Sequence, residues 1–370
     1  MMLLVDSHCD APLLLSRGAD FGKKVPQGFV PGSFPVTHVD YPRMKKGGVN
    51  ASFFAIYTPC SLSPDEATHR ALELVSKVYD SIEANPDKVS LATTSSQVRR
   101  NARNGLISIL LGMENGAPLQ NDLSLLRMFH RMGVRYLTLT HSRSNQICDS
   151  CNSPEPVWHG LSPFGREVVA ECNRLGIMVD ISHTSDETVW DVLNCSKTPI
   201  IASHSCCRAL CNHPRNLTDD MIKAIAEKGG VVQVNFYPSF LSEKYTEAKG
   251  TLPDEYDEAD MAWRQNPSDP GLQRNLEKAY KAYASVPLPS YKSVVDHIEH
   301  VISLVGTKHV GIGSDFDGIE FGPSGLEDIS KMQRIIIELR KRGYSEYDIR
   351  GIAGGNLLRV MDEIQNIGRQ

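Results

Sequence analysis

The sequence of 370 residues lacks the features that mark several protein classes. It contains no apolar run near the roughly 20 residues that a transmembrane helix requires. It has no excess of positive charge, since the formal net charge is -5, and we therefore expect no nucleic-acid partner. No glycine-rich dinucleotide or phosphate-binding fingerprint follows any of its apolar segments. These absences leave a globular protein of ordinary composition, with 41% hydrophobic and 22% charged residues.

The start of the chain lacks the marks of a secretory signal. The first residues, MMLLVDSHCD, contain no basic region, no long apolar region and no small-residue cleavage site. We therefore expect a cytoplasmic protein, or the mature form of an exported protein whose signal was removed. A secretory leader would have to precede this numbering.

The cysteines do not form a disulfide or zinc-ribbon pattern. There are 9 of them, and an odd number in a chain of this size argues against a disulfide framework. Two groups stand out in the sequence, Cys148 with Cys151, and Cys206 and Cys207 with Cys211. Neither group has the paired spacing of a zinc ribbon, so we interpret them as free thiols.

Eight short apolar segments recur along the chain, and helical stretches separate them. They cover residues 3–7, 50–57, 106–113, 134–140, 178–182, 199–203, 231–236 and 309–314. Alternation of nearly continuous apolar strands with helices predicts a parallel sheet covered by helices. Eight such units favour a closed (β/α)8 TIM-type barrel over an open sheet. We expect a single barrel domain over residues 1–370.

The helical stretches carry start and stop signals. The stretch 63–85 opens with Ser63 as N-cap, Pro64 at the first helical position and Glu66 three residues after the cap. The stretch 163–175 stops before Gly176, a typical C-cap residue. Further helices are predicted at 186–193, 219–228, 276–284, 326–341 and 345–365.

One region departs from the strand–helix alternation. A polar insertion of about 50 residues, at about 241–290, separates the seventh and eighth predicted strands. It is too long for a plain connection. Two interpretations stay open for it, a functional lid or helical excursion, and a surface insertion that helps assembly.

Ionisable side chains follow six of the eight predicted strands. In a barrel of this type the active site lies at the carboxyl ends of the strands. The residues at these ends, in chain order, are His8, Asp10, Glu114, His141, His183, His204 and Asp315. Each one alone has an ordinary structural explanation. Together they would be costly to bury without a compensating charge, and a metal cluster supplies that charge.

The residue types suit zinc, because imidazoles and carboxylates are both zinc ligands. We assign His8, Asp10 and Glu114 to one ion, and Glu114, His183 and His204 to the other. The Glu114 carboxylate has two oxygens and can serve both ions. This arrangement predicts two Zn²⁺ per chain, about 3.5–4 Å apart, in a binuclear metal site. A water bridging them would lose a proton near neutral pH and become a nucleophile.

A series of motifs gives the chain a specific resemblance. The motifs are VDSHCDAP, GMENGAPL, RYLTLTH, DISHTS, SHSCCRALCNHPRNLTDD, VNFY, GIGSDFDG and GGNLLRV, and they extend from residue 5 to residue 360. With these motifs, in this order, the chain resembles the membrane dipeptidase (renal dipeptidase) family of zinc peptidases. Cys9 and Asn115 depart from the residues common in that family, and neither is a predicted ligand. The insertion at about 241–290 matches none of the motifs.

The resemblance implies roles for individual residues. It implies the same five metal ligands as the strand ends do. It also implies that Asp315 handles protons, that His141 contacts the substrate, and that Arg215 binds the substrate carboxylate. An Arg suits a carboxylate because its planar fork can donate two hydrogen bonds. Tyr237 follows the seventh predicted strand, and we expect it to line the pocket.

The predicted function is that of a zinc-dependent dipeptidase, with a metal-bridging hydroxide as nucleophile and His141 helping to stabilise the oxyanion. The resemblance also implies tolerance of a C-terminal D-residue. It leaves a homodimer open. One alternative is another amidohydrolase or lactonase on the same barrel, but many of those bridge their metals with a strand-four Lys, which residues 134–141 lack. A second alternative is a non-catalytic metal-binding scaffold, which should have lost a ligand or Asp315.

Overall fold

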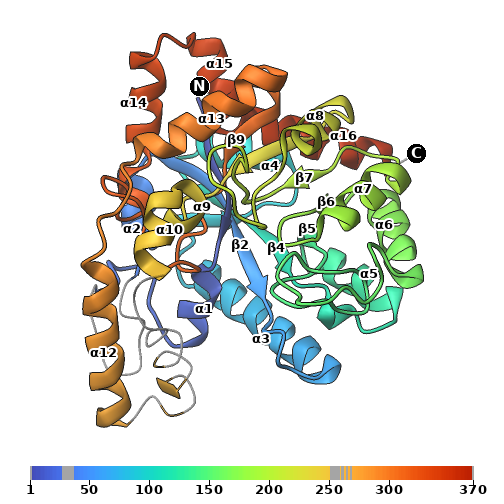
Figure 1. The fold of residues 1–370 in the computed structure, drawn as a ribbon, viewed down its shortest axis with the longest axis horizontal. Helices are drawn as coiled ribbons and strands as arrows, with labels where there is room; N and C mark the ends of the chain where they lie inside the picture. Colours follow the sequence, from blue (N-terminus) through green and yellow to red (C-terminus); the bar gives the residue numbers. More distant parts are fainter. Residues whose placement is uncertain are drawn as a thin grey trace.

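A parallel sheet forms the centre of the molecule, and helices surround it (Figure 1). The computed structural model describes residues 2–26, 37–250, 259, 262–263, 266 and 269–368. The strand order around the sheet is β1-β2-β4-β5-β6-β7-β8-β9, and all neighbouring pairs are parallel. The strands are β1 (Leu4–Cys9), β2 (Val49–Tyr57), β4 (Ile107–Glu114), β5 (Val134–Thr138), β6 (Met178–Asp180), β7 (Ile201–Ala202), β8 (Val231–Val234) and β9 (Val310–Ile312). This sheet confirms the predicted barrel.

The barrel is nearly closed by contacts between the first and last strands. The Asp315 amide donates to the His8 carbonyl at 3.0 Å, and the Asp10 amide donates to the Phe316 carbonyl at 2.8 Å. The Ser314 hydroxyl also donates to a carboxylate oxygen of Asp6 at 2.6 Å. This seam brings the first and last strands together, so that the polar residues after β9 lie beside those of β1.

Several strands are shorter than predicted, and one strand was not predicted. The sixth predicted strand, 199–203, shortens to Ile201–Ala202. Its ladder ends because the Ser203 amide donates to Asp180 Oδ1 at 2.7 Å rather than to a neighbouring strand. A further strand, β3 (Val89–Leu91), pairs with β4 outside the barrel order. It has three residues, which is too short for a periodic signal.

Helices follow most of the strands. They are α1 (Ala11–Ser16), α2 (Tyr41–Lys46), α3 (Pro64–Glu83), α4 (Ser95–Arg103), α5 (Leu123–Arg131), α6 (Pro163–Leu175), α7 (Asp186–Cys195), α8 (Asp219–Glu227), α13 (Lys292–Val305), α14 (Gln333–Lys341), α15 (Glu346–Arg350) and α16 (Asn356–Ile367). The predicted capping box of α3 is present, with Ser63 and Glu66 each accepting from the other's amide. Helix α6 ends at Gly176, whose φ of 74° is in the left-handed region.

The C-terminal helices begin and break at positions that the sequence did not indicate. The helix predicted at 326–341 begins only at Gln333, after a short 3-10 turn, η3 (Ile329–Lys331). The helix predicted at 345–365 is divided by a π-turn, η4 (Gly351–Gly355). A Cβ at Gly354 would lie 3.0 Å from the Leu3 carbonyl oxygen and 2.8 Å from the Val5 Cβ. The break therefore accompanies close packing of this segment against β1.

Helix α9 (Pro238–Leu241) directly precedes the predicted insertion, which contains helices α10 (Glu243–Gly250) and α12 (Pro270–Ala284). Helix α12 starts earlier than the predicted 276–284 and lies to one side of the barrel (Figure 1). Trp263, Leu276, Ala279 and Tyr283 form a small buried cluster separate from the barrel core. Parts of the insertion, including 251–258, lie outside the described residues. The choice between lid and assembly surface, and the single-domain division, stay predictions.

Within the described part of the chain, no helix combines the length and the apolar character that crossing a bilayer would require.

Candidate metal-binding active site

The predicted metal ligands come together at the carboxyl ends of the strands. His8 lies on β1 and Glu114 is the last residue of β4. Asp10 follows β1 directly, and His183 and His204 follow β6 and β7. The side chains of His8, His204, Glu114 and Asp10 are buried, and that of His183 is 11% exposed. The structure thus brings these five side chains together, and their role as metal ligands stays a prediction.

Glu114 lies at the centre of this group. Its Oε1 atom is 3.2 Å from His183 Nε2 and 3.7 Å from His204 Nε2. Its Oε2 atom is 3.5 Å from His8 Nε2. The two carboxylate oxygens therefore face imidazoles from different strands, which is the placement that a carboxylate shared between two ions requires.

The carboxylates near His8 come from both sides of the barrel seam. His8 Nε2 is 3.4 Å from Asp10 Oδ2 and 3.9 Å from Asp315 Oδ1. This nitrogen is buried and has no hydrogen-bond partner among the described residues. A buried polar atom of this kind is costly unless something binds it, and a cation would do so.

Three groups of side chains could each hold an ion by the proximity of their donor atoms. Every group has donor atoms within 4.8 Å of one another. The groups are His8 with Glu114 and His204, Glu114 with His141 and His183, and His8 with Asp10 and Asp315. The groups share residues with one another. One of them, His8 with Glu114 and His204, combines residues that were assigned to different ions. The division into two ligand sets therefore stays a prediction.

Residues behind the imidazoles fix the direction of their Nε2 atoms. His8 Nδ1 lies 2.7 Å from the Tyr136 hydroxyl. His204 Nδ1 lies 2.7 Å from the Ser203 hydroxyl, which donates to Asp180 Oδ2 at 2.6 Å. Partners on Nδ1 orient the ring and leave Nε2 for a metal, as in most protein metal sites. His183 Nε2 and His204 Nε2 are 2.9 Å apart, and a cation bound to both would relieve the repulsion of their lone pairs.

The backbone at the site is held in an uncommon conformation. His183 and Asp315 have φ angles of 71° and 62°, in the left-handed region. Such residues cost of order 1–3 kcal/mol each and cluster at functional sites. His and Asp are among the side chains that tolerate this region best. This backbone conformation directs both side chains toward the cluster of candidate ligands. The surrounding fold offsets its energetic cost.

Burial and charge set the protonation of the site. Burial lowers the pKa of His183 and of His204 well below the usual range, so both imidazoles are neutral and can bind a metal. Burial also raises the pKa of the Asp315 carboxyl to about 6 and raises that of Asp10. At His8, burial disfavours the imidazolium, but the Glu114 and Asp10 carboxylates outweigh it and raise the pKa. The carboxylates thus attract positive charge, and a divalent cation fits this donor set.

His141 and Arg215 lie beside the ligand cluster. The His141 ring centroid is 4.1 Å from that of His183, and burial lowers the His141 pKa to about 3. Arg215 Nη2 donates to the His204 carbonyl at 3.2 Å. The Arg215 side chain is 4% exposed, and its Nε has no partner within the described structure. Both residues are thus in reach of a molecule bound at the cluster.

Tyr237 is placed differently from the other predicted site residues. It directly precedes α9, and its hydroxyl lies 2.6 Å from Lys249 Nζ of α10. Its amide donates to Asn235 Oδ1 at 2.6 Å. The side chain is therefore tied to the insertion, and its predicted role in lining the pocket stays a prediction.

Sequence reasoning missed Asn235 as a member of the site. Its Nδ2 donates to Asp315 Oδ2 at 2.9 Å, and the residue is fully buried. It follows β8 directly and lies near the end of the seventh predicted strand, 231–236, within the VNFY motif. Its position at a strand end was a usable signal, but an uncharged amide did not stand out in a search for ionisable groups.

Gly318 is expected to be required for the placement of two carboxylates. A Cβ there would collide with Asp10 and would lie 2.7 Å from Asp315 Oδ1. Because a displacement of about 1 Å at a reacting group costs up to about 100-fold, Gly318→Ala should lower kcat/KM for a dipeptide at least about tenfold. Gly250→Ala is the matched control, because its Cβ meets no described residue within 4 Å. Equal kinetics of the two variants would contradict this role.

Comparisons with known proteins place the chain in a family. The family model described as Membrane dipeptidase (Peptidase family M19) matches residues 1–370. Dipeptidase aclJ of Aspergillus oryzae is 37% identical over 342 residues, which cover 90% of this chain and 71% of that protein.

Two solved structures share the fold over nearly the whole chain. The probable dipeptidase PvdM from Pseudomonas aeruginosa has a TM-score of 0.81 and 28% identity, and the match covers 99% of this chain and 96% of PvdM. A metallo peptidase from Rhodobacter sphaeroides, liganded with a phosphinate mimic of the dipeptide L-Ala-D-Ala, has a TM-score of 0.78 and 27% identity, covering 98% and 99% of the two chains. Together with the clustered side chains that could hold a metal ion, these matches show that the chain belongs to the membrane dipeptidase family and is a metal-dependent dipeptidase.

Proposed function

We propose that this dipeptidase works with two zinc ions that share Glu114. The proposed ligands are His8, Asp10, Glu114, His183 and His204. The observation that carries the proposal is the position of Glu114, whose two oxygens face imidazoles from different strands at 3.2 and 3.5 Å. When bound, the ions would supply a bridging hydroxide as nucleophile and polarise the peptide carbonyl.

The protons are handled by the chain itself in this proposal. Asp315 accepts a proton from the nucleophile and passes it to the leaving amine. Asn235 holds one Asp315 oxygen by a hydrogen bond of 2.9 Å, which leaves Asp315 Oδ1 toward His8 and the cluster. His141, neutral because of its burial, can donate a hydrogen bond to the oxyanion.

Arg215 sets the class of substrate in this proposal. A buried guanidinium whose Nε has no partner among the described residues favours an anionic group, and the free C-terminal carboxylate of a dipeptide is such a group. Binding of that carboxylate would restrict the enzyme to short peptides. The Rhodobacter peptidase was solved with a mimic of L-Ala-D-Ala, which supports testing a D-residue at the C-terminal position here.

The function can be tested with a panel of L-L and L-D dipeptides and the zinc-loaded protein. We expect release of free amino acids, loss of that activity after treatment with a chelator, and its return on addition of Zn²⁺. His183→Ala is the control and should be strongly impaired. Equal cleavage by the wild type and His183→Ala would exclude the two-metal proposal. Turnover of lactones or cyclic amides with no dipeptide turnover would favour the alternative hydrolase.

A further inference from the structure

We propose that Arg208, paired with Asp186, is a positioning residue that holds the backbone on both sides of Arg215 and thereby sets the affinity for the substrate carboxylate. The inference rests on the proposed role of Arg215. Arg208 lies in the SHSCCRALCNHPRNLTDD motif, seven residues before Arg215, and no role in the site has so far been given to it.

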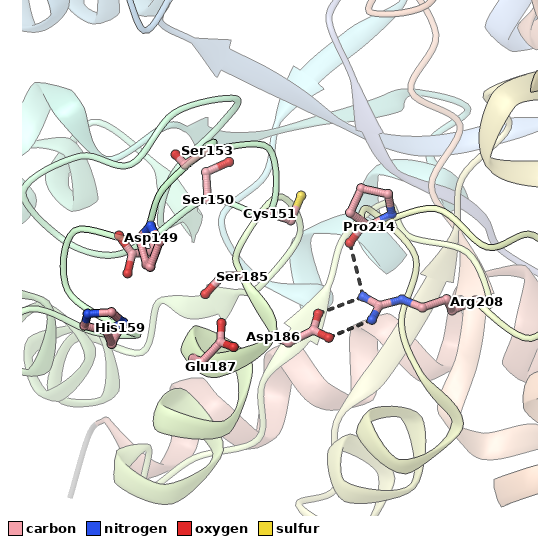
Figure 2. Close-up of a pocket in the computed structure, with 11 residues that line it drawn as sticks. Asp149, Ser150, Cys151, Ser153, His159, Ser185, Asp186, Glu187, Arg208 and Pro214 are labelled. Carbon is pink, nitrogen blue, oxygen red and sulfur yellow. Dashed lines mark hydrogen bonds and ion pairs between the residues drawn. The ribbon is translucent and has the colours of Figure 1, made fainter. Parts of the chain in front are cut away.

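The hydrogen bonds of Arg208 reach both neighbours of Arg215. Its Nε donates to the Asn216 carbonyl at 2.9 Å, and its Nη2 donates to the Pro214 carbonyl at 3.2 Å. Figure 2 shows the second of these contacts. Pro214 has no N–H group, so its carbonyl is the one backbone hydrogen-bonding group through which it can be held. One carbonyl belongs to the peptide unit that joins Pro214 to Arg215, and the other to the unit that follows Asn216. The backbone is therefore held on both sides of Arg215.

Asp186 holds the Arg208 guanidinium from the other side. Its carboxylate accepts from Nη1 at 2.6 Å and from Nη2 at 2.7 Å, in a two-point pair that Figure 2 shows. Hydrogen bonding to Asp186 raises the pKa of Arg208. Asp186 is the first residue of α7 and comes three residues after His183. The pair therefore connects the segment that carries a predicted metal ligand with the loop that carries Arg215.

The surroundings explain why this loop needs a polar support. A cavity of about 360 Å³ lies behind it, and Pro214, Arg208, Asp186 and Cys151 contribute to its wall (Figure 2). On this side the loop meets open space instead of packed side chains. The Arg215 side chain is nonetheless buried. The hydrogen bonds of the planar Arg208 guanidinium thus position this loop, whereas packed side chains position the backbone elsewhere in the barrel.

Lysine cannot replace arginine in this position. The four contacts use a fixed planar fork, in which the two Nη atoms face Asp186 while Nε and Nη2 reach the carbonyls. A lysine ammonium can keep the charge beside Asp186, but it has a single donor centre. Arg208→Lys therefore separates the effect of charge from the effect of the fork.

The test measures KM and kcat for a dipeptide and for the same dipeptide with a C-terminal amide. For Arg208→Ala we expect KM for the dipeptide to rise about tenfold, with kcat changed by less than about threefold, because uniform binding is lost rather than catalysis. Kinetics of the amide, which lacks the carboxylate, should change little, so the preference for the dipeptide falls. Arg208→Lys should show a smaller rise in KM in the same direction. Metal content and thermal unfolding are recorded for each variant.

Two controls make the outcomes distinct. Arg166→Ala removes the neighbouring ion pair with Asp191, which is 2.9 Å long, and should leave the preference unchanged. Arg215→Ala should abolish the preference for the dipeptide over its C-terminal amide. If Arg215→Ala abolishes it while Arg208→Ala and Arg208→Lys keep the parent KM, the inference about Arg208 is wrong. If Arg215→Ala keeps the preference, the proposed role of Arg215 is wrong, and the inference falls with it.

Discussion

Glu114→Ala is expected to lower kcat/KM for a dipeptide by about 1,000-fold or more and to remove bound metal. The carboxylate lies 3.2 Å from His183 Nε2 and 3.5 Å from His8 Nε2, so its loss removes a donor from both predicted ligand sets. Metal ions supply several kcal/mol of transition-state stabilisation, and each 1.36 kcal/mol corresponds to about tenfold in rate. The measurements are steady-state kinetics and elemental analysis of the purified protein.

Glu171→Gln provides the matched control for this variant. Glu171 is also a buried glutamate, but it pairs with Arg127 and Arg174 on the helical layer. The control should retain metal and activity. A Glu114→Ala protein that keeps two metal ions and more than about a tenth of the parent activity would contradict the shared-ligand proposal.

Asp315→Asn should lower kcat by about 100- to 10,000-fold while metal stays bound, because general acid–base catalysis contributes effects of this size. The asparagine has nearly the same shape and can still accept the hydrogen bond from Asn235, which is 2.9 Å long in the parent. It cannot accept the proton of the nucleophile. Kinetics combined with metal analysis separates this loss from a loss of the ions.

Asp317→Asn is the control for this second variant. Asp317 has a similar left-handed φ of 68°, but its carboxylate accepts from the His38 amide at 2.6 Å, away from the cluster. Its substitution should lower kcat less than about tenfold. Equal losses in the two variants, or metal loss that accounts for the Asp315→Asn effect, would argue against a proton-transfer role.

Local patterns predicted the barrel and the ends of some of its helices. The start of α3 at Pro64 and the end of α6 before Gly176 follow from capping signals within a few residues. The predictions failed where tertiary contacts override local preference. Helix α14 begins at Gln333 rather than 326, and the Ser203 amide leaves its strand ladder for Asp180.

The candidate ligands could be predicted because of one topological rule. Carboxyl ends of parallel strands meet at one end of a barrel, so residues as distant in sequence as His8 and His204 must approach each other. No such rule predicts the residues that form hydrogen bonds with the candidate ligands or support the site. The Tyr136 hydroxyl on His8 Nδ1 comes from the interior of β5, at a sequence separation of 128 residues. Asn235 carries no charge, so a search for ionisable groups does not find it. The sequence around Arg208 does not distinguish it from a solvated loop residue.

The sequence by itself therefore determined the series of eight barrel strands, the end of the barrel at which the candidate ligands gather, and their side-chain types. These features depend on local periodicity and on one rule of topology. The tertiary structure decided which oxygen of Glu114 faces which imidazole, how Asn235 holds Asp315, and how Arg208 and Asp186 hold the loop of Arg215. Those contacts join segments far apart in the chain, and their distances are fixed only when the barrel closes.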